Sequence, residues 1–320
     1  MVAPGRRWLG SALRMQSGLA ATVIGCFSVL GAAGVGFGIG LQLGVLLGGI
    51  VLVGFPHGAF DHLVARPILR HRLSRRWWVP FLAGYLGLAG LVGLAWTFAP
   101  AATTAGFLAA SVLHFGLGDT ADGLAPDRVP RFFTLLTYGA LPILLPAAFH
   151  PEGAAPVLAA LARVEPGVMQ HALSRAVWLL PAWAAAFAWI VTAAWRENRG
   201  TAERLATAAG FVLLPPLLAF GLYFGLGHSV RHVLRLGAWR DPWNFWAAMR
   251  WAARVILPAG VVCAAGLGGL ALAGRDAVAD LLAPGFQIIA ALTLPHMIVT
   301  GWLDGSEDRP EVAGPERDIG

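Results

Sequence analysis

The sequence predicts an all-α membrane protein, a polytopic helix bundle with about eight or nine transmembrane segments. Of its 320 residues, 57% are hydrophobic and only 12% are charged, whereas a soluble domain carries about 25% charged residues. Long apolar runs recur from one end of the chain to the other. This composition cannot cover a water-facing surface of normal polarity, so we expect one membrane domain and not a soluble domain with an anchor.

Each predicted span is a run of roughly 20 mostly apolar residues, the length of helix that crosses a hydrocarbon core. The 41 glycines fit such helices, because small residues let helices approach closely within a membrane. The pair Pro215-Pro216 indicates a break in one run, which would then form a re-entrant half-helix. The predicted spans cover residues 17–34, 37–55, 78–98, 101–118, 132–149, 173–195, 205–226, 247–273 and 283–303.

Polar segments at the two ends of the chain mark the predicted domain boundaries. Residues 1–16 are arginine-rich and are expected to form a cytoplasmic N-terminal segment. Residues 17–303 hold the apolar runs and form the predicted polytopic membrane domain. Residues 304–320 read as a polar C-terminal tail.

The net charge of +6 is explained by topology and does not predict a nucleic-acid partner. Most arginines lie in short segments between apolar runs, above all in the stretch 66–76, where they mark cytoplasmic loops and contact lipid headgroups. The arginine rule fails near the end of the chain if 205–226 is a full span, because the segment after it would then lie outside the cytoplasm. That segment contains Arg231, Arg235 and Arg240. A half-helix at 205–226 would remove the discrepancy. We expect an integral membrane protein.

Histidine is the residue type that points to chemistry. Imidazole is unfavourable inside a bilayer, so intramembrane histidines are usually functional, and histidine is the commonest metal ligand. Six of the nine histidines occur in four short motifs beside apolar runs, which predicts an intramembrane metal site. The motifs are Pro56-His57-Gly58-Ala59-Phe60-Asp61-His62, His114-Phe115-Gly116-Leu117-Gly118-Asp119, His228-Ser229-Val230-Arg231-His232 and Leu294-Pro295-His296-Met297.

Spacing assigns a role to some of these histidines. His228 and His232 are four residues apart and share one face of a helix, which suits two ligands of one ion. Of His57 and His62, one is expected to bind metal and the other to support it. Asp61 between them suits a hydrogen-bonding role, in which it accepts a ring N–H and fixes the tautomer.

The remaining motif residues lie at the ends of spans. His114 is a candidate ligand near the end of the fourth span, five residues before Asp119. His296 follows Pro295 in the last span and is expected to line the pocket in preference to binding metal directly. Tyr223 adds polarity beside the His228 motif. Each of two motifs also has an explanation without metal. The histidines of the His228 motif could contact lipid headgroups, and the His57 motif could form a helix-capping turn at the membrane surface.

The donor set indicates which metal would bind. Cys26 and Cys263 form no CxxC pair, so no thiolate site is predicted. A site of four imidazoles without thiolate or carboxylate suits iron or copper better than structural zinc. Open coordination positions on such an ion are typical of an oxygenase.

These four motifs, in this order between about residues 54 and 304, resemble the Brp/Blh family of microbial β-carotene 15,15′-dioxygenases. The resemblance implies Fe(II), O₂ and cleavage of β-carotene at its central 15,15′ double bond into two all-trans-retinal. It implies iron ligation by four of the histidines and maps the family's other motif histidines to His62 and His296. The implied ligands are His57, His114, His228 and His232.

The resemblance also implies a cellular setting, an integral protein of a bacterial inner membrane, where carotenoid breakdown supplies retinal. β-Carotene is a hydrocarbon that reaches the enzyme through lipid, and a microbial rhodopsin would receive the product. Phe55 and Phe60 are bulkier than the family pattern, and the first fifty residues carry no family signature. The identity of the carotenoid therefore stays open.

Two other functions remain as alternatives. The spacings of His57 with His62 and of His228 with His232 resemble the boxes of membrane di-iron desaturases and hydroxylases, but the HxxHH boxes of those enzymes do not occur. A transporter would use intramembrane histidines and carboxylates as a relay. Few acidic residues lie inside the predicted spans, which favours the metal site.

Overall fold

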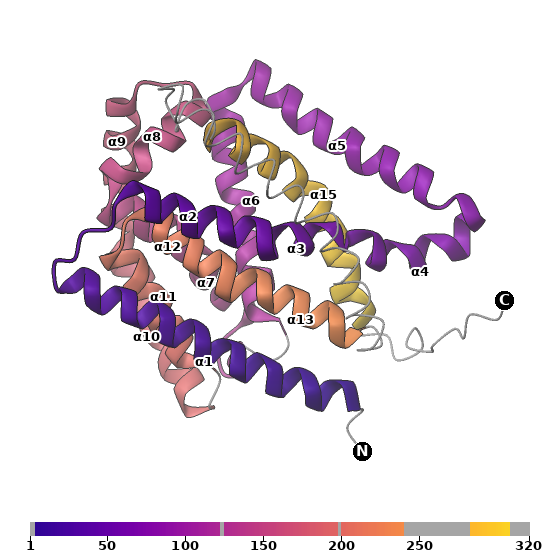
Figure 1. Ribbon diagram of the computed structural model, residues 1–320, viewed down its shortest axis with the longest axis horizontal. Coiled ribbons are helices and arrows are strands. Elements are labelled where there is room, and N and C mark those ends of the chain that lie inside the picture. Colours follow the sequence, from indigo (N-terminus) through magenta and orange to yellow (C-terminus); the bar gives the residue numbers. More distant parts are fainter. Residues whose placement is uncertain (1–3, 122–124, 198–199, 240–281, 308–320) are drawn as a thin grey trace.

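The computed structural model describes residues 4–121, 125–197, 200–239 and 282–307, and all regular structure in these ranges is helical (Figure 1). The all-α prediction is confirmed. Within these ranges seven segments are long and apolar enough to cross a membrane, close to the predicted eight or nine. They are Leu9–Ala32, Ile39–Leu73, Trp78–Phe98, Pro100–Thr120, Arg131–Phe149, Pro166–Arg196 and Ala283–Gly301.

The helices follow one another with short connections. The first half of the chain forms α1 (Pro4–Ala32), α2 (Ile39–Gly49), the π-helical η1 (Ile50–Gly54), α3 (Phe55–Ala59), α4 (Asp61–Leu73), η2 (Ser74–Arg76), α5 (Trp78–Phe98), α6 (Pro100–Thr120) and α7 (Arg131–Phe149). The second half forms α8 (Pro151–Ala162), α9 (Pro166–Ser174), η3 (Arg175–Leu179), α10 (Leu180–Arg196), α11 (Thr201–Leu213), α12 (Pro216–Leu222), the π-helical η4 (Tyr223–His228), α13 (Ser229–Trp239) and α15 (Ala283–Glu307).

Two helices extend across the positions where the polar end segments were expected to meet the membrane domain. Helix α1 begins at Pro4, so the helix already includes most of the predicted segment 1–16. Helix α15 continues to Glu307, past the predicted start of the tail at residue 304. The predicted span 247–273 lies outside the described residues.

The predicted break at Pro215-Pro216 is confirmed. Leu214 ends α11 with extended backbone angles (φ −112°, ψ 152°), and α12 begins at Pro216. The cause is local, because proline disfavours the α conformation in the residue before it and lacks an N–H for a helical hydrogen bond. The chain then continues without interruption through α12, η4 and α13, which carry His228 and His232. A single 205–226 span is therefore wrong.

Glycines bring the two site-bearing helices together. Helix α2 with η1 lies alongside α12 with η4 (Figure 1). A Cβ atom on Gly49 would lie 3.2 Å from the carbonyl oxygen of Gly221 and 3.3 Å from the Cα of Gly225. Only small residues allow this approach of backbones, as predicted for a membrane bundle. The approach places the motif that follows η1 beside the motif that follows η4.

The outer surface of the bundle is apolar where it would meet lipid. In α5, which lies at one edge of the bundle in Figure 1, Leu82, Leu86, Leu91 and Leu94 are exposed. Exposed leucines at this density suit a hydrocarbon solvent and not water. The polar side chains of the site lie buried inside the bundle.

Candidate metal centre

Five imidazoles from five segments converge at the centre of the bundle. They come from α3, α6, the end of η4, α13 and α15, and His57 is the one that the other four surround. Its ring centroid lies 4.2 Å from that of His232, 4.6 Å from His296, 5.2 Å from His228 and 5.8 Å from His114. All are buried except His114, which is half-buried.

The ring nitrogens face one another. One nitrogen each of His57, His114 and His228 lie within 4.8 Å of one another, and the same holds for His57, His232 and His296. Nε2 of His114 and Nε2 of His228 are 3.1 Å apart. Two nitrogens that each lie 2.0–2.1 Å from one ion are about 3 Å apart when their bonds form a right angle.

Several of these nitrogens have no hydrogen-bond partner within the described part of the chain. They are both ring nitrogens of His57, Nε2 of His232 and Nε2 of His296, and all are buried. Buried polar atoms are nearly always satisfied, so each exception needs an explanation. Lone pairs directed into one polar cluster fit a bound metal ion.

The local backbone explains how the histidines reach this point. The π-helical segments η1 and η4 directly precede α3 and α13, and π-helical turns, which shift the helical register, often occur at functional sites. Gly118 makes room for His228, since a Cβ on Gly118 would lie 2.8 Å from its Cε1. Gly54 likewise leaves space for Phe224, since a Cβ on Gly54 would lie 2.8 Å from Cε1 of that ring. The Phe224 ring packs against His57 and His228.

Asp119 orients His228 from the end of α6. Its carboxylate is fully buried and lies 3.4 Å from Nδ1 of His228. It also accepts hydrogen bonds of 3.0 Å from Arg204 and from the hydroxyl of Tyr223. Because a carboxylate only accepts, it holds the proton on Nδ1 and leaves the Nε2 lone pair facing the other imidazoles.

A buried charge network continues from Asp119. Nη1 of Arg231 lies 3.7 Å from the Asp119 carboxylate, and its Nη2 forms an ion pair with Glu203. Gln16 on α1 donates to Glu203 at 3.3 Å and to the carbonyl oxygen of Leu226 at 2.8 Å. Arg231 is only 1% exposed. Arg231 is therefore an interior residue. The rule that arginines in loops lie on the cytoplasmic side does not apply to it.

Asp61 orients His296 in a similar way. Its Oδ1 lies 2.7 Å from Nδ1 of His296, and its Oδ2 accepts a 2.8 Å hydrogen bond from the hydroxyl of Tyr85. Three helices, α4, α5 and α15, supply the three side chains. Asp61 and His296 are both buried.

The structure brings together every predicted ligand and most of the predicted supporting residues. His57, His114, His228 and His232 lie in the cluster, and Asp61, Asp119 and Tyr223 contact it or its histidines. His296, predicted to line the pocket, lies among the other imidazoles. The ligand roles themselves stay predictions.

His62 lies apart from the cluster. Its Nδ1 is 2.7 Å from the carbonyl oxygen of Ala59 in the preceding turn, and the side chain is half-buried. The physical reason is the turn at Phe60 between α3 and α4, after which Asp61 and not His62 faces α15. Of the two histidines in this motif, the geometry favours His57 as the ligand.

Sequence reasoning missed the residues that anchor the two aspartates. Arg204 lies in a stretch that resembles a loop, and Arg231 resembles an interfacial charge. Glu203 and Tyr85 belong to no motif. Charged residues next to apolar runs were the available signal, because buried charges in a bundle must be paired. Which charge pairs with which depends on contacts between distant helices, and spacing does not reveal these.

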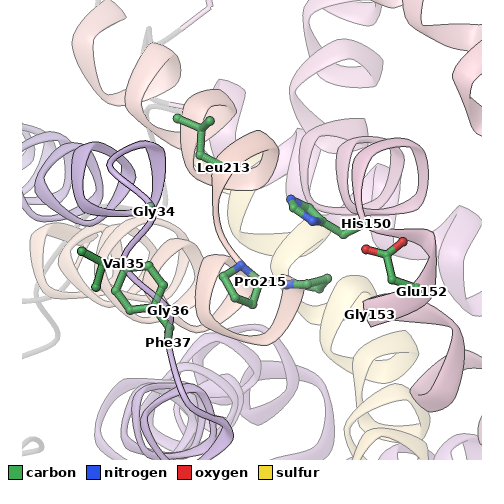
Figure 2. A pocket seen from close by; sticks show the side chains of 11 residues that line it. Gly34, Val35, Gly36, Phe37, His150, Glu152, Gly153, Leu213 and Pro215 are labelled. Atoms are coloured by element: carbon green, nitrogen blue, oxygen red, sulfur yellow. The ribbon is translucent and has the colours of Figure 1, made fainter.

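One pocket lies elsewhere, beside the break between α11 and α12 (Figure 2). Its cavity of about 410 Å³ is bounded by the α1–α2 connection and the start of α8. His150, on its wall, contacts the carbonyl oxygen of Val212 at 2.9 Å. No residue of this pocket belongs to the imidazole cluster.

Comparison with known proteins identifies the family. A family model for β-carotene 15,15′-dioxygenase matches residues 48–304. The probable β-carotene 15,15′-dioxygenase Blh of Halobacterium salinarum is 32% identical over 289 residues, which cover 81% of this chain and 83% of the relative. The probable β-carotene 15,15′-dioxygenase Brp of that organism is 27% identical over 331 residues, which cover 85% and 86%. No solved structure gives a significant match.

The matched range contains all five clustered histidines and both aspartates that contact them. The resemblance seen in the motifs therefore extends over most of the chain. The chain belongs to the β-carotene 15,15′-dioxygenase family.

Proposed function

We propose that this protein is an iron-dependent dioxygenase that cleaves β-carotene at its central 15,15′ double bond and releases two all-trans-retinal. The observation that carries the proposal is the cluster of buried imidazoles inside an apolar helix bundle. The names of the relatives supply the substrate class.

The donor set supports iron. His57, His114, His228 and His232 offer four neutral nitrogens, and no thiolate joins them among the described residues. Such a set suits iron or copper. Bound Fe(II) would supply the electrons that allow O₂ to react with a closed-shell polyene. The protein holds His228 in the required tautomer through Asp119 and balances the charge of that carboxylate with Arg204 and Arg231.

The reaction needs no further reactant. The double bond between C15 and C15′ breaks, and each carbon takes one oxygen atom of O₂ to become an aldehyde. No proton, hydride or second oxidant enters the balance. The protein's own task is thus to position the polyene and to exclude water from the imidazoles.

The surroundings of the cluster suit a hydrocarbon. Phe224 packs against His57 and His228, Phe115 packs edge-on against His228, and Phe220 stacks on Phe224. These rings form an apolar wall beside the imidazoles. A substrate that dissolves in lipid would reach the site through the bilayer, and the retinal would leave by the same route to a retinal-binding membrane protein such as a microbial rhodopsin.

Expression in bacteria that accumulate β-carotene tests the proposal. The wild-type chain should deplete β-carotene and produce retinal at two molecules for each carotene lost, measured by chromatography of extracted pigments. His228→Ala should abolish retinal formation. His171→Ala is the matched control, because His171 is exposed and bonds locally to Arg175.

Other outcomes would redirect the assignment. Apocarotenals of other lengths would keep the oxygenase and move the cleavage position. Hydroxylated or desaturated carotenoid would favour the di-iron alternative. Intact β-carotene in cells that hold folded, iron-loaded protein would contradict the proposed reaction.

A further inference from the structure

We propose that His296 is a fifth metal ligand and that Asp61 and Tyr85 are the positioning residues that aim it. This inference rests on the proposed metal site and adds a residue to it. Four observations support it: the tautomer of His296, the position of its free nitrogen, the charge around Asp61 and the parallel with His228.

The hydrogen bond to Asp61 fixes the tautomer of a neutral His296. Nδ1 lies 2.7 Å from Oδ1 of Asp61, and a carboxylate oxygen can only accept. The ring proton therefore sits on Nδ1, and Nε2 carries the lone pair. A carboxylate, a histidine and a metal in this order form a common arrangement, in which the carboxylate makes the imidazole a better donor.

The lone pair of His296 points into the imidazole cluster. Its ring centroid lies 4.6 Å from that of His57, 5.3 Å from His232 and 5.3 Å from His114. Nε2 is buried and has no hydrogen-bond partner among the residues that the structure describes. It lies within 4.8 Å of a nitrogen of His57 and a nitrogen of His232. An ion held by His57 and His232 is thus within reach of His296.

The buried Asp61 carboxyl group has no arginine or lysine beside it in the described part of the chain. Asp61 is 3% exposed, and its side-chain contacts in the described part of the chain are His296 and the Tyr85 hydroxyl. Neither partner is a permanent cation. A buried carboxylate without a compensating charge is strongly unfavourable. A metal ion bound through His296 would supply that charge.

The same unit occurs on the other side of His57. Asp119 contacts His228 and accepts from the hydroxyl of Tyr223, as Asp61 contacts His296 and accepts from Tyr85. Each unit thus consists of an aspartate, a tyrosine and a histidine. Because His228 is a predicted ligand, the parallel favours the same role for His296.

Metal binding by purified protein tests the inference without any assay of activity. The apoprotein is titrated with Co(II), and both the dissociation constant and the visible absorption spectrum are measured. His296→Gln keeps a donor for Asp61 but removes the imidazole, so we expect at least a tenfold weaker affinity and an altered spectrum. Asp61→Asn keeps His296 and should weaken binding by roughly 10- to 100-fold. His171→Gln should match wild type in both measurements.

Unchanged Co(II) affinity and spectrum in His296→Gln would overturn the inference, even if that variant were less stable. If His296→Gln does not fold, Asp61→Asn decides, and wild-type Co(II) affinity in that variant would overturn the inference. Failure of the proposed function looks different. Wild-type protein with a His296-dependent Co(II) spectrum that leaves β-carotene intact would keep the inference and contradict the reaction.

Discussion

The two aspartates beside the imidazole cluster have matching hydrogen bonds and different charge environments. Asp119 and Asp61 each contact one histidine and accept a hydrogen bond from one tyrosine. Asp119 also has Arg204 at 3.0 Å and Arg231 at 3.7 Å. In the described part of the chain no arginine or lysine forms an ion pair with Asp61.

This difference indicates that one local unit serves two purposes. The Asp119 unit is balanced by charges of the protein itself, so it contributes to the stability of the bundle whether or not a metal is bound. In the Asp61 unit, the compensating positive charge would come from the metal ion proposed to bind His296. The same substitution at Asp119 and at Asp61 should therefore have different effects. Four predictions test this difference.

The largest expected effect is on stability when Asp119 is neutralised. Asp119→Asn removes the described ion pair of Arg204 and leaves Arg231 with its ion pair to Glu203. Loss of one member of a buried ionic network should lower the free energy of unfolding by about 3–5 kcal/mol. Asp61→Asn should cost clearly less in the metal-free protein. Thermal denaturation of both variants in detergent measures the difference, and equal losses would contradict the proposed contrast.

Metal should stabilise the two variants to different extents. An ion that binds only the folded state at a hundred times its dissociation constant adds about 2.7 kcal/mol to stability. If Asp61→Asn weakens binding tenfold, the same metal concentration adds about 1.4 kcal/mol. The measurement is the shift in denaturation temperature with and without Co(II). A wild-type shift in Asp61→Asn would show that Asp61 does not act through the metal.

The sequence was sufficient to predict the all-α membrane bundle and the histidines that come together in it. Hydrophobic runs of span length indicate a helix surrounded by lipid. The pair Pro215-Pro216 indicates a local break in a helix. The four histidine motifs indicate a functional site, because histidine is unfavourable inside a bilayer unless it is used. These signals are local, so they are visible without knowledge of the tertiary structure.

The parts that were not predicted depend on contacts between distant helices. Arg204 pairs with Asp119 across 85 positions, and His296 meets Asp61 across 235. The turn at Phe60 decides that Asp61 faces α15 and that His62 does not. None of these outcomes has a periodicity or spacing that marks it in the chain.

Substitution of Gly118 should disturb the Asp119 side alone. A Cβ there would lie 2.8 Å from Cε1 of His228, so Gly118→Ala must displace the ring. Overpacking of this kind costs about 1–3 kcal/mol, and retinal formation should fall. Gly106→Ala in the same helix is the control, because a Cβ on Gly106 meets no atom within 4 Å. Normal product formation by Gly118→Ala would show that the position of His228 is less constrained.

The smallest expected effects are those of the two tyrosine hydroxyls, and they separate the units most cleanly. Tyr223→Phe removes a 3.0 Å hydrogen bond to Asp119, and Tyr85→Phe removes a 2.8 Å hydrogen bond to Asp61. Each loss should cost about 1 kcal/mol. Because Asp119 keeps its arginines, Tyr223→Phe should reduce stability and leave Co(II) affinity nearly unchanged. Tyr85→Phe should weaken Co(II) binding, because His296 is then the one described side chain that holds Asp61 in place. Identical behaviour of the two variants would mean that the tyrosines support the fold in the same way and that Asp61 has no separate link to the metal.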